Sequence, residues 1–239
     1  MIGASSVRLE GVSVNDVVAI VAGAGGELGR ATARKLMAAG YTVVGIDRKP
    51  DALHELPDNV GHQVGDPTDP AVARRLIDRI ATEVGPPHVL VNTIGTYRPG
   101  PALDTTPEDL RNMMDVNAGT ALWLTQAVAP HMRERGAGAI VHVAARPGLE
   151  PTPGMAAYSA SKAALVHLTR VLDLELRPLG IRVNAVAPQL MDTAKTRSYL
   201  PATVLAHAVS PDAIADLIAY LISDAATPIS GAVVPIYGP

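Results

Sequence analysis

Short apolar runs rich in β-branched residues alternate along the chain with longer segments in which apolar residues recur at helical spacing. The runs predict strands at residues 17–21, 42–46, 89–91, 139–143 and 181–186. Nearly continuous apolar strands are typical of a parallel sheet that is covered by helices on both faces and joined by right-handed crossovers. The pattern therefore predicts an α/β fold with a doubly wound parallel β-sheet.

Polar residues and glycines mark the ends of the predicted helices. The segment Asp66-Pro-Thr-Asp69 precedes a helix at 71–84, and Thr105-Thr-Pro107-Glu108 begins another helix with proline in its first turn. Glycine readily adopts the left-handed conformation in which many helices end. We therefore expect helices to end at Gly40, Gly85 and Gly180.

Glycines and prolines are spread between the predicted elements and form no linker or repeat. A chain of 239 residues lies within the length that one α/β domain commonly reaches. We therefore expect a single domain over residues 1–239. Its least regular stretch, residues 194–210, falls between a late strand and a late helix, where a flap over a ligand is expected.

Composition narrows the class of protein. Hydrophobic residues make up 48% of the chain and charged residues 18%, which is typical of a folded domain with a large core. The net charge of −3 argues against a nucleic-acid partner. The chain has no cysteine, so it has neither disulfides nor a thiolate nucleophile, and we expect no metal site and a cytoplasmic location. The first residues show no secretory signal or lipid anchor, and no apolar stretch is long enough to span a membrane.

A glycine-rich turn follows the first predicted strand. Residues 17–21 lead into Ala22-Gly-Ala-Gly-Gly-Glu-Leu-Gly29 and then into a helix at 30–39. In this context glycine allows a tight turn and a close approach of the backbone to pyrophosphate, and the helix N-terminus presents free N–H groups. The order of strand, turn and helix favours a dinucleotide over an ordinary structural turn.

The second predicted strand ends near Asp47, 18 residues beyond Gly29. An acid about 20 residues after such a turn accepts hydrogen bonds from the adenine ribose. Because a carboxylate repels a 2′-phosphate, Asp47 favours NAD(H) over NADP(H), although the adjacent Arg48 softens this preference.

Tyr158 and Lys162 are four residues apart in a predicted helix and share one of its faces. A neighbouring ammonium and an oxidised nicotinamide together favour the phenolate form of a tyrosine. Tyr158 then becomes a usable general acid and base near neutral pH. By itself such a pair is common on protein surfaces, so its meaning depends on the other motifs.

These motifs, together with Asn92-Thr-Ile-Gly95, Asn117 and Ile181-Arg-Val-Asn-Ala-Val-Ala-Pro188, stand in the order and spacing of the short-chain dehydrogenase/reductases, which the whole chain resembles. The resemblance implies a Rossmann-type sheet, a small-molecule substrate and a homotetramer. It implies that Tyr158 exchanges a proton with the substrate, Lys162 holds the nicotinamide ribose and Asn117 holds a water. It further implies these cofactor contacts: Gly23, Gly25, Gly26, Leu28 and Gly29 at the pyrophosphate, Asp47 at the ribose, Asp66 and Pro67 at the adenine, Asn92 and Gly95 behind the cofactor, and the backbone through Pro188, Leu190 and Thr193 at the carboxamide.

The chain departs from this family at its fourth catalytic position. The family has a serine thirteen residues before the tyrosine, where this chain has Ala145. Loss of one oxyanion donor costs ~2.7–4 kcal/mol of transition-state stabilisation. Neither His142 nor Ser161 is expected to replace the hydroxyl, and Thr152, in the loop before the helix, is more often a turn-stabilising residue.

The segment 145–155 resembles the corresponding segment of the dihydropteridine reductases. Those enzymes also carry alanine at the position of Ala145, and a basic residue follows it, as Arg146 does in this chain. Like this chain, that branch of the family has a residue other than glycine at the position of Glu27, and its flap is short. Its members use NADH. A quinonoid or imine C=N bond is protonated at nitrogen and needs no second oxygen donor. Asn117 instead follows the mainstream of the family, so carbonyl and C=N substrates both stay open.

A rival interpretation from another class is a dinucleotide-binding sensor or scaffold without turnover. Ala145 is its strongest argument, because a binding module has no use for a complete set of donors. The joint presence of Tyr158, Lys162 and Asn117 argues against it. Arg146 is expected either to contact an electron-rich substrate group or to lie solvated in its loop.

Overall fold

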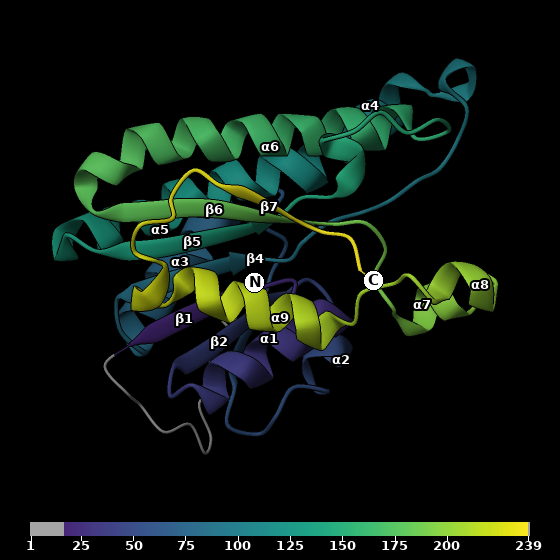
Figure 1. Ribbon diagram of the computed structural model, residues 1–239. Coiled ribbons are helices and arrows are strands. Elements are labelled where there is room, and N and C mark those ends of the chain that lie inside the picture. The colour runs from purple at the N-terminus through teal and green to yellow at the C-terminus, as the bar shows by residue number, and fades with distance from the viewer. Residues whose placement is uncertain (1–16, 239) are drawn as a thin grey trace, which may run out of the picture.

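Seven parallel strands form one sheet in the computed structural model, which describes residues 17–238 (Figure 1). The sheet has the order β3-β2-β1-β4-β5-β6-β7. Its strands are β1 (Val18–Ala22), β2 (Thr42–Asp47), β3 (Gly61–Val64), β4 (Pro87–Asn92), β5 (Gly138–Val143), β6 (Ile181–Pro188) and β7 (Val233–Ile236). The expected absence of a secretory signal and of a lipid anchor concerns residues 1–16, which lie outside the described residues.

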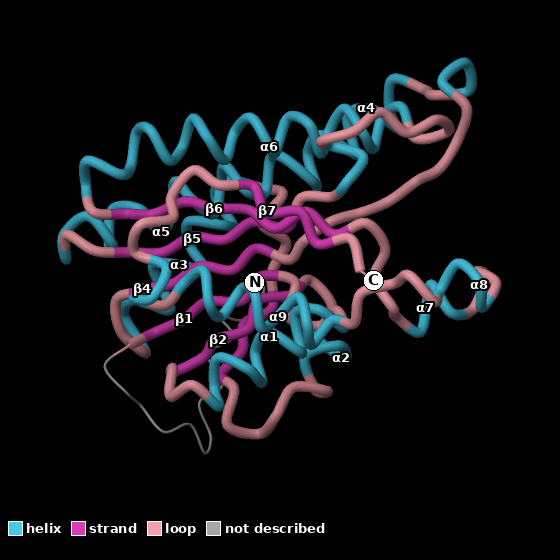
Figure 2. Tube along the Cα trace, in the orientation of Figure 1, coloured by secondary structure: helices cyan, strands magenta, loops and turns pink. Residues whose placement is uncertain are grey.

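Helices cover both faces of the sheet, as the α/β prediction required (Figure 2). One face packs against α1 (Glu27–Ala38) and α9 (Pro211–Ile222). The other packs against α3 (Pro70–Glu83), α5 (Thr120–Arg135) and α6 (Ala156–Leu176). The shorter helices are α2 (Pro50–Leu53), α4 (Pro107–Met114), α7 (Ala194–Arg197) and α8 (Ala202–Leu205). Among the described helices, none combines the length and apolarity that crossing a bilayer requires.

Strand β1 shows why the apolar runs are nearly continuous. Successive strand residues point to opposite faces, and here both faces are covered. Ala19 and Val21 lie in the core beneath α1 and α9, whereas Ile20 and Ala22 lie in the core beneath the helices of the other face. Every residue of β1 is therefore buried, and the Rossmann-type fold class is confirmed.

The predicted helix starts are confirmed in detail. Asp69 caps α3, because its side chain accepts hydrogen bonds from the backbone N–H groups of Ala71 and Val72. Thr106 and Asp109 form a capping box at the start of α4, with Pro107 as the first helical residue. Such reciprocal caps satisfy backbone N–H groups that have no partner within the helix.

The edge strands β3 and β7 were not predicted. The β3 sequence Gly-His-Gln-Val lacks an apolar run, since an edge strand needs less burial than a central one. The β7 sequence contains Pro235, which normally argues against a strand but is tolerated at a sheet edge, where one side of the backbone has no ladder partner.

The strand order reverses between β1 and β4. The chain builds outward from β1 to β3 and then returns to place β4 on the other side of β1. Loops that leave the carboxyl ends of these strands diverge at this point and leave room for a ligand. The helices α7 and α8 project beyond the same end of the sheet, at the right of Figure 1.

Candidate active site

A groove of about 380 Å³ lies where the strand order reverses. The loops that follow β1, β2, β3 and β4 all contribute to it. Its lining includes Gly23, Gly25, Gly26, Asp47, Arg48, Asp66, Pro67, Thr93, Gly95 and Thr96. The topology therefore brings the sequence-predicted pyrophosphate, ribose and adenine positions to one surface.

The glycine-rich turn makes the start of this groove tight. Gly23 has a φ of +80°, which side-chain-bearing residues rarely adopt. A Cβ on Gly29 would lie 2.2 Å from the carbonyl oxygen of Gly23, so α1 approaches the turn too closely for any side chain there. Leu28 is buried in the core and anchors the first turn of α1. A backbone cradle without side chains at the start of a helix fits the pyrophosphate of a dinucleotide.

Asp47 closes the turn from the end of β2. One carboxylate oxygen accepts a hydrogen bond from the backbone N–H of Gly25 at 3.1 Å. The other accepts a hydrogen bond from the backbone N–H of Lys49 at 3.0 Å. Each carboxylate oxygen can accept a second hydrogen bond, so both can still receive ribose hydroxyls. Asp47 therefore holds the turn in shape and also faces the groove.

At the end of the groove formed by the loops after β2 and β3, Arg48 forms an ion pair with Asp66 at 3.7 Å. Burial acts to raise the pKa of Asp66, but hydrogen bonds from Thr68 and the charge of Arg48 outweigh it and lower that pKa. Pro67 lies beside this pair in the groove lining. Both side chains of this pair are largely exposed, so the pair holds Arg48 only weakly.

The end of β4 supplies the opposite wall. Asn92 is buried; its amide donates to Thr120 at 3.3 Å and its oxygen accepts from the backbone N–H of Ile94 at 3.1 Å. The Thr93 hydroxyl donates to the carbonyl of Ala22 at 2.8 Å and joins the ends of β4 and β1. These bonds shape the loop that carries Gly95 into the groove.

Asn117 lies in a π-helical turn, Asp115–Gly119, between α4 and α5. Its side-chain oxygen accepts from the backbone N–H of Thr96 at 2.8 Å, and its amide donates to the Thr96 carbonyl at 3.0 Å and to the Ser161 hydroxyl at 2.9 Å. The side chain is fully buried. Asn117 therefore joins the β4 loop to α6, and the bound water predicted at this residue stays a prediction.

Lys162 reaches from α6 toward the same loop. Only 3% of the residue is exposed, and its amine donates to the carbonyl of Val143 at 2.7 Å. A Cβ on Gly95 would lie 3.3 Å from both this amine and the side-chain oxygen of Asn117. Burial lowers the pKa of Lys162 to about 8. The glycine thus leaves the space in which these two polar groups converge beside the groove.

Tyr158 lies one helical turn before Lys162 on α6. Its ring meets that of Tyr97 edge-on, with centroids 5.0 Å apart and planes at 83°. Burial and then the neighbouring Tyr97 raise the pKa of Tyr158 to about 12. The sequence predicted that a neighbouring ammonium and an oxidised nicotinamide together favour the phenolate, and this joint effect stays a prediction. Within the protein, desolvation of the phenol dominates, and Lys162 is not among the causes of the shift.

Ala145 is buried and lies two residues after the end of β5. The next residue, Arg146, is not simply solvated. Its guanidinium donates to Glu150 at 2.7 Å and to Gln189 at 2.8 Å, and it lies 4.8 Å from the ring centroid of Tyr237, which itself donates to Glu150 at 3.1 Å. This network ties the loop after β5 to residues that follow β6 and β7.

The other candidate donors have structural contacts. Thr152 donates to the Glu150 carbonyl at 3.4 Å, as expected of a turn-stabilising hydroxyl. Ser161 is buried and donates to the Tyr158 carbonyl at 2.8 Å. His142 is fully buried beside the Thr125 hydroxyl at 3.4 Å, and burial, followed by the charge of Lys162, lowers its pKa to about 3. None of these contacts places a hydroxyl in the role of the missing serine.

The segment from Pro188 to Thr193 leaves the carboxyl end of β6. The carbonyl of Leu190 accepts from Val209 at 2.8 Å, which holds the two ends of the predicted flap together. Thr193 caps α7 through its hydroxyl. The flap at 194–210 therefore contains two single-turn helices, α7 and α8, within the irregular stretch that the sequence indicated.

The sequence alone did not indicate three contacts of this site. Tyr97 packs against Tyr158, Ser161 supports Asn117, and Glu27 bonds to the flap at Ala194. Tyr97 stands two residues after Gly95, and this proximity was its only sequence signal. In the sequence, Glu27 stood out only as a residue other than glycine. Its partner, Ala194, lies 167 residues further along the chain.

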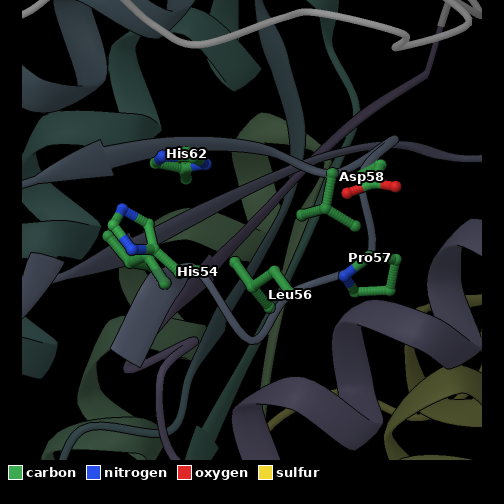
Figure 3. Close-up of a pocket in the computed structure, with 7 residues that line it drawn as sticks. His54, Leu56, Pro57, Asp58 and His62 are labelled. Carbon is green, nitrogen blue, oxygen red and sulfur yellow. The ribbon is translucent and has the colours of Figure 1, made fainter. Parts of the chain in front are cut away.

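A second hollow of about 270 Å³ lies outside this site, between α2 and the edge strand β3. Figure 3 shows His54, Asp58 and His62 around it, above the apolar side chain of Leu56. The two imidazole rings are 6.5 Å apart. Among the described residues, no group of three or more histidine, aspartate or glutamate side chains is arranged to hold a metal ion.

These features define the class of protein. A parallel doubly wound sheet, a glycine turn under a helix and an acid at the end of β2 form a dinucleotide-binding site, and a buried lysine and a tyrosine adjoin it. The family model described as short chain dehydrogenase matches residues 17–203. The chain belongs to the short-chain dehydrogenase/reductase family and is an oxidoreductase.

Named relatives match over nearly the whole chain. The chain is 32% identical to 4-formylbenzenesulfonate dehydrogenase of Comamonas testosteroni, covering 95% of this chain and 98% of the relative. It is 36% identical to galactitol 2-dehydrogenase of Rhizobium johnstonii, covering 91% and 92%. The crystal structure of NAD+-bound xylitol dehydrogenase superposes with a TM-score of 0.87 at 27% identity, covering 95% of this chain and all of that chain.

Proposed function

We propose that this protein is an NAD(H)-dependent oxidoreductase that interconverts a small carbonyl compound and its alcohol. One observation carries the proposal: the buried amine of Lys162 comes to Gly95 in the wall of the groove, and Tyr158 packs on Tyr97 two residues further on. The acid/base pair of α6 therefore adjoins the dinucleotide groove. A nicotinamide dinucleotide held there supplies or accepts the hydride.

The chain's own residues divide the work in this proposal. Tyr158 donates a proton to the substrate oxygen during reduction, and its raised pKa keeps the phenol protonated at neutral pH for that purpose. Lys162 holds the nicotinamide ribose, for which the position of its amine beside Gly95 suits it. Asn117 positions the β4 loop against α6, and we retain it as the support of the proton relay.

The preference for NAD(H) over NADP(H) rests on charge at the end of β2. Asp47 presents a carboxylate to the groove, and Arg48, the nearby cation, is paired with Asp66. This carboxylate would repel a 2′-phosphate, and Arg48 would have to leave its weak pair with Asp66 to compensate. The superposed xylitol dehydrogenase was solved with NAD+, which supports the same choice.

Asp47→Ala should weaken NADH binding roughly 10-fold or more, because hydrogen bonds to a charged group contribute about 1.5–3 kcal/mol. NADPH binding should improve, since the repelling carboxylate is gone. Fluorescence titration with both cofactors measures the ratio of dissociation constants. Asp51→Ala is the matched control, because it removes the same charge from an exposed position on α2. An unchanged ratio in Asp47→Ala would show that the ribose binds elsewhere.

The substrate class follows from two lines of support. The relatives named above act on an aromatic aldehyde and on a polyol by their names, which favours carbonyl and alcohol chemistry. The absence of a donor at Ala145 favours a second candidate, a quinonoid or imine C=N substrate like that of the dihydropteridine reductases. Such a substrate needs only the proton of Tyr158.

Ala145→Ser distinguishes these candidates. For a carbonyl substrate, the new hydroxyl should raise kcat/KM toward ketones, by up to ~10²-fold, the lower value measured for an oxyanion donor. The measurement is NADH oxidation with 2,3-butanedione, benzaldehyde and a quinonoid dihydropterin in parallel. If Ala145→Ser turns over the carbonyl compounds at the wild-type rate and the dihydropterin is the faster substrate, the second candidate replaces the first.

The same substrates test the proposed function against a sensor or scaffold. We expect NADH fluorescence to change on binding and a single turnover of bound NADH to proceed with at least one of the three compounds. Binding of NADH without its oxidation across the panel would support the sensor. The homotetramer and the cytoplasmic location stay predictions; analytical ultracentrifugation measures the former.

A further inference from the structure

Glu27 connects the glycine-rich turn to the flap. It is the first residue of α1, immediately after Gly26. One carboxylate oxygen accepts a hydrogen bond from the backbone N–H of Ala194 at 2.8 Å, and the other lies 4.0 Å from the guanidinium of Arg197. Ala194 begins α7, so one side chain joins elements that lie 167 residues apart in the sequence.

The flap presents a preformed partner to Glu27. Thr193 and Thr196 cap α7 reciprocally, and Arg197 pairs with Asp192 at 2.9 Å. The N–H of the first residue of a helix has no acceptor within that helix. Glu27 supplies this acceptor to Ala194, and the bond is charge-assisted.

Two of the cations near Glu27, Arg30 and Arg34, have other partners. A cavity of about 330 Å³ separates α1 from the flap, and Glu27, Arg30, Arg34 and Arg197 line it. Arg30 donates to the Gly25 carbonyl and pairs with Glu55, and Arg34 pairs with Asp212. Because open space separates the two elements here, the Glu27 contact spans a gap that apolar packing leaves unfilled.

The position of this contact relates it to the cofactor groove. The glycine turn leaves the carboxyl end of β1, and residues 188–193 leave the carboxyl end of β6 at the same edge of the sheet. A dinucleotide with its pyrophosphate at the turn and its nicotinamide beside residues 188–193, as the proposed function requires, would be enclosed where Glu27 joins the two segments. We infer that Glu27 is a positioning residue that latches the flap over the bound dinucleotide and slows its release.

The identity of the ligand in this inference rests on the proposed function, whereas the contact of Glu27 with the flap does not. Hydrogen bonds to charged groups contribute enough to slow release about tenfold, whereas a neutral bond contributes less. The Arg197 ion pair is longer and half exposed, so it adds little. Glu27→Ala should therefore speed NADH release about tenfold, and Glu27→Gln, which keeps an acceptor oxygen, about twofold to fivefold.

Two measurements on the full-length protein test the latch. Amide hydrogen exchange of residues 194–199 should be faster in Glu27→Ala than in the wild type, both with and without NADH. Stopped-flow displacement of NADH gives its dissociation rate. Glu55→Ala is the matched control, because it removes the same charge and Glu55 pairs with Arg30, which lies on the same helix as Glu27. This control should leave both readouts as in the wild type.

The outcomes separate the two claims. Wild-type exchange and wild-type NADH release in Glu27→Ala would overturn the latch. A wild type that binds no NADH would overturn the proposed function, while the exchange measurement still decides whether Glu27 holds the flap. Intermediate behaviour of Glu27→Gln in both readouts supports the hydrogen bond to Ala194 as the cause, and a full loss in Glu27→Gln would assign the effect to charge alone.

Discussion

Tyr158→Phe should lower kcat for hydride transfer by roughly 10²–10⁴-fold, the usual contribution of a positioned general acid. The ring and its edge-on contact with Tyr97 remain in this variant, so only the hydroxyl is lost. NADH binding should stay close to that of the wild type, since the groove itself is unchanged. Single-turnover absorbance of bound NADH measures the chemical step, and fluorescence titration measures binding.

The pH dependence of the wild type adds a second check on this role. With a pKa of about 12, Tyr158 is protonated at neutral pH, which is the form required for reduction. Alcohol oxidation requires the phenolate, so its rate should rise with pH while the reduction rate does not. Tyr220→Phe, on the surface of α9, is the matched control and should behave as the wild type. Retained turnover in Tyr158→Phe would refute the acid/base assignment.

Gly29→Ala should destabilise the fold and abolish measurable NADH binding. Its Cβ would lie 2.2 Å from the Gly23 carbonyl oxygen and 2.7 Å from the Cα of Ala24, both backbone atoms that cannot rotate away. Overpacking of this kind costs about 1–3 kcal/mol of unfolding free energy. Thermal unfolding should show a drop in Tm of roughly 2–4 °C per kcal/mol for a chain of this size.

Gly26→Ala is the companion variant that separates stability from binding. Its Cβ would lie 3.4 Å from the Gly23 carbonyl oxygen, an ordinary contact, so the Tm should stay near that of the wild type. NADH affinity should still fall, because the methyl group would occupy the surface assigned to the pyrophosphate. If both glycine variants bind NADH as the wild type does, the pyrophosphate is assigned to the wrong turn.

The sequence predicted the central strands well and the edge strands not at all. The central strand β1 is buried on both faces, and burial on both faces requires an uninterrupted apolar run that the sequence displays. The edge strands β3 and β7 each pair with one neighbouring strand, so they need no continuous apolar run. Their sequences can therefore include polar residues in β3 and Pro235 in β7. Helix caps at Asp69 and Thr106 were readable because a cap and its partner lie within a few residues.

The candidate site divides in the same way. Residues whose role depends on a local backbone shape, such as the glycine turn and the Tyr158–Lys162 spacing, were identified from the sequence. The surroundings of those residues were not. The sequence did not indicate that Tyr97 packs against Tyr158 or that Asn117 joins the β4 loop to α6. The joint effect of Lys162 and an oxidised nicotinamide on Tyr158 stays a prediction.

By itself, the sequence determined the alternation of strands and helices, the glycine-rich turn between β1 and α1 and the spacing of Tyr158 and Lys162, because each of these depends on neighbours along the chain. Tertiary structure alone decided which groups meet: the amine of Lys162 with the Val143 carbonyl, Arg146 with Gln189, and Glu27 with the flap. These pairs are separated by 19 to 167 residues, and their proximity arises from the order of strands in the sheet, which no local pattern encodes.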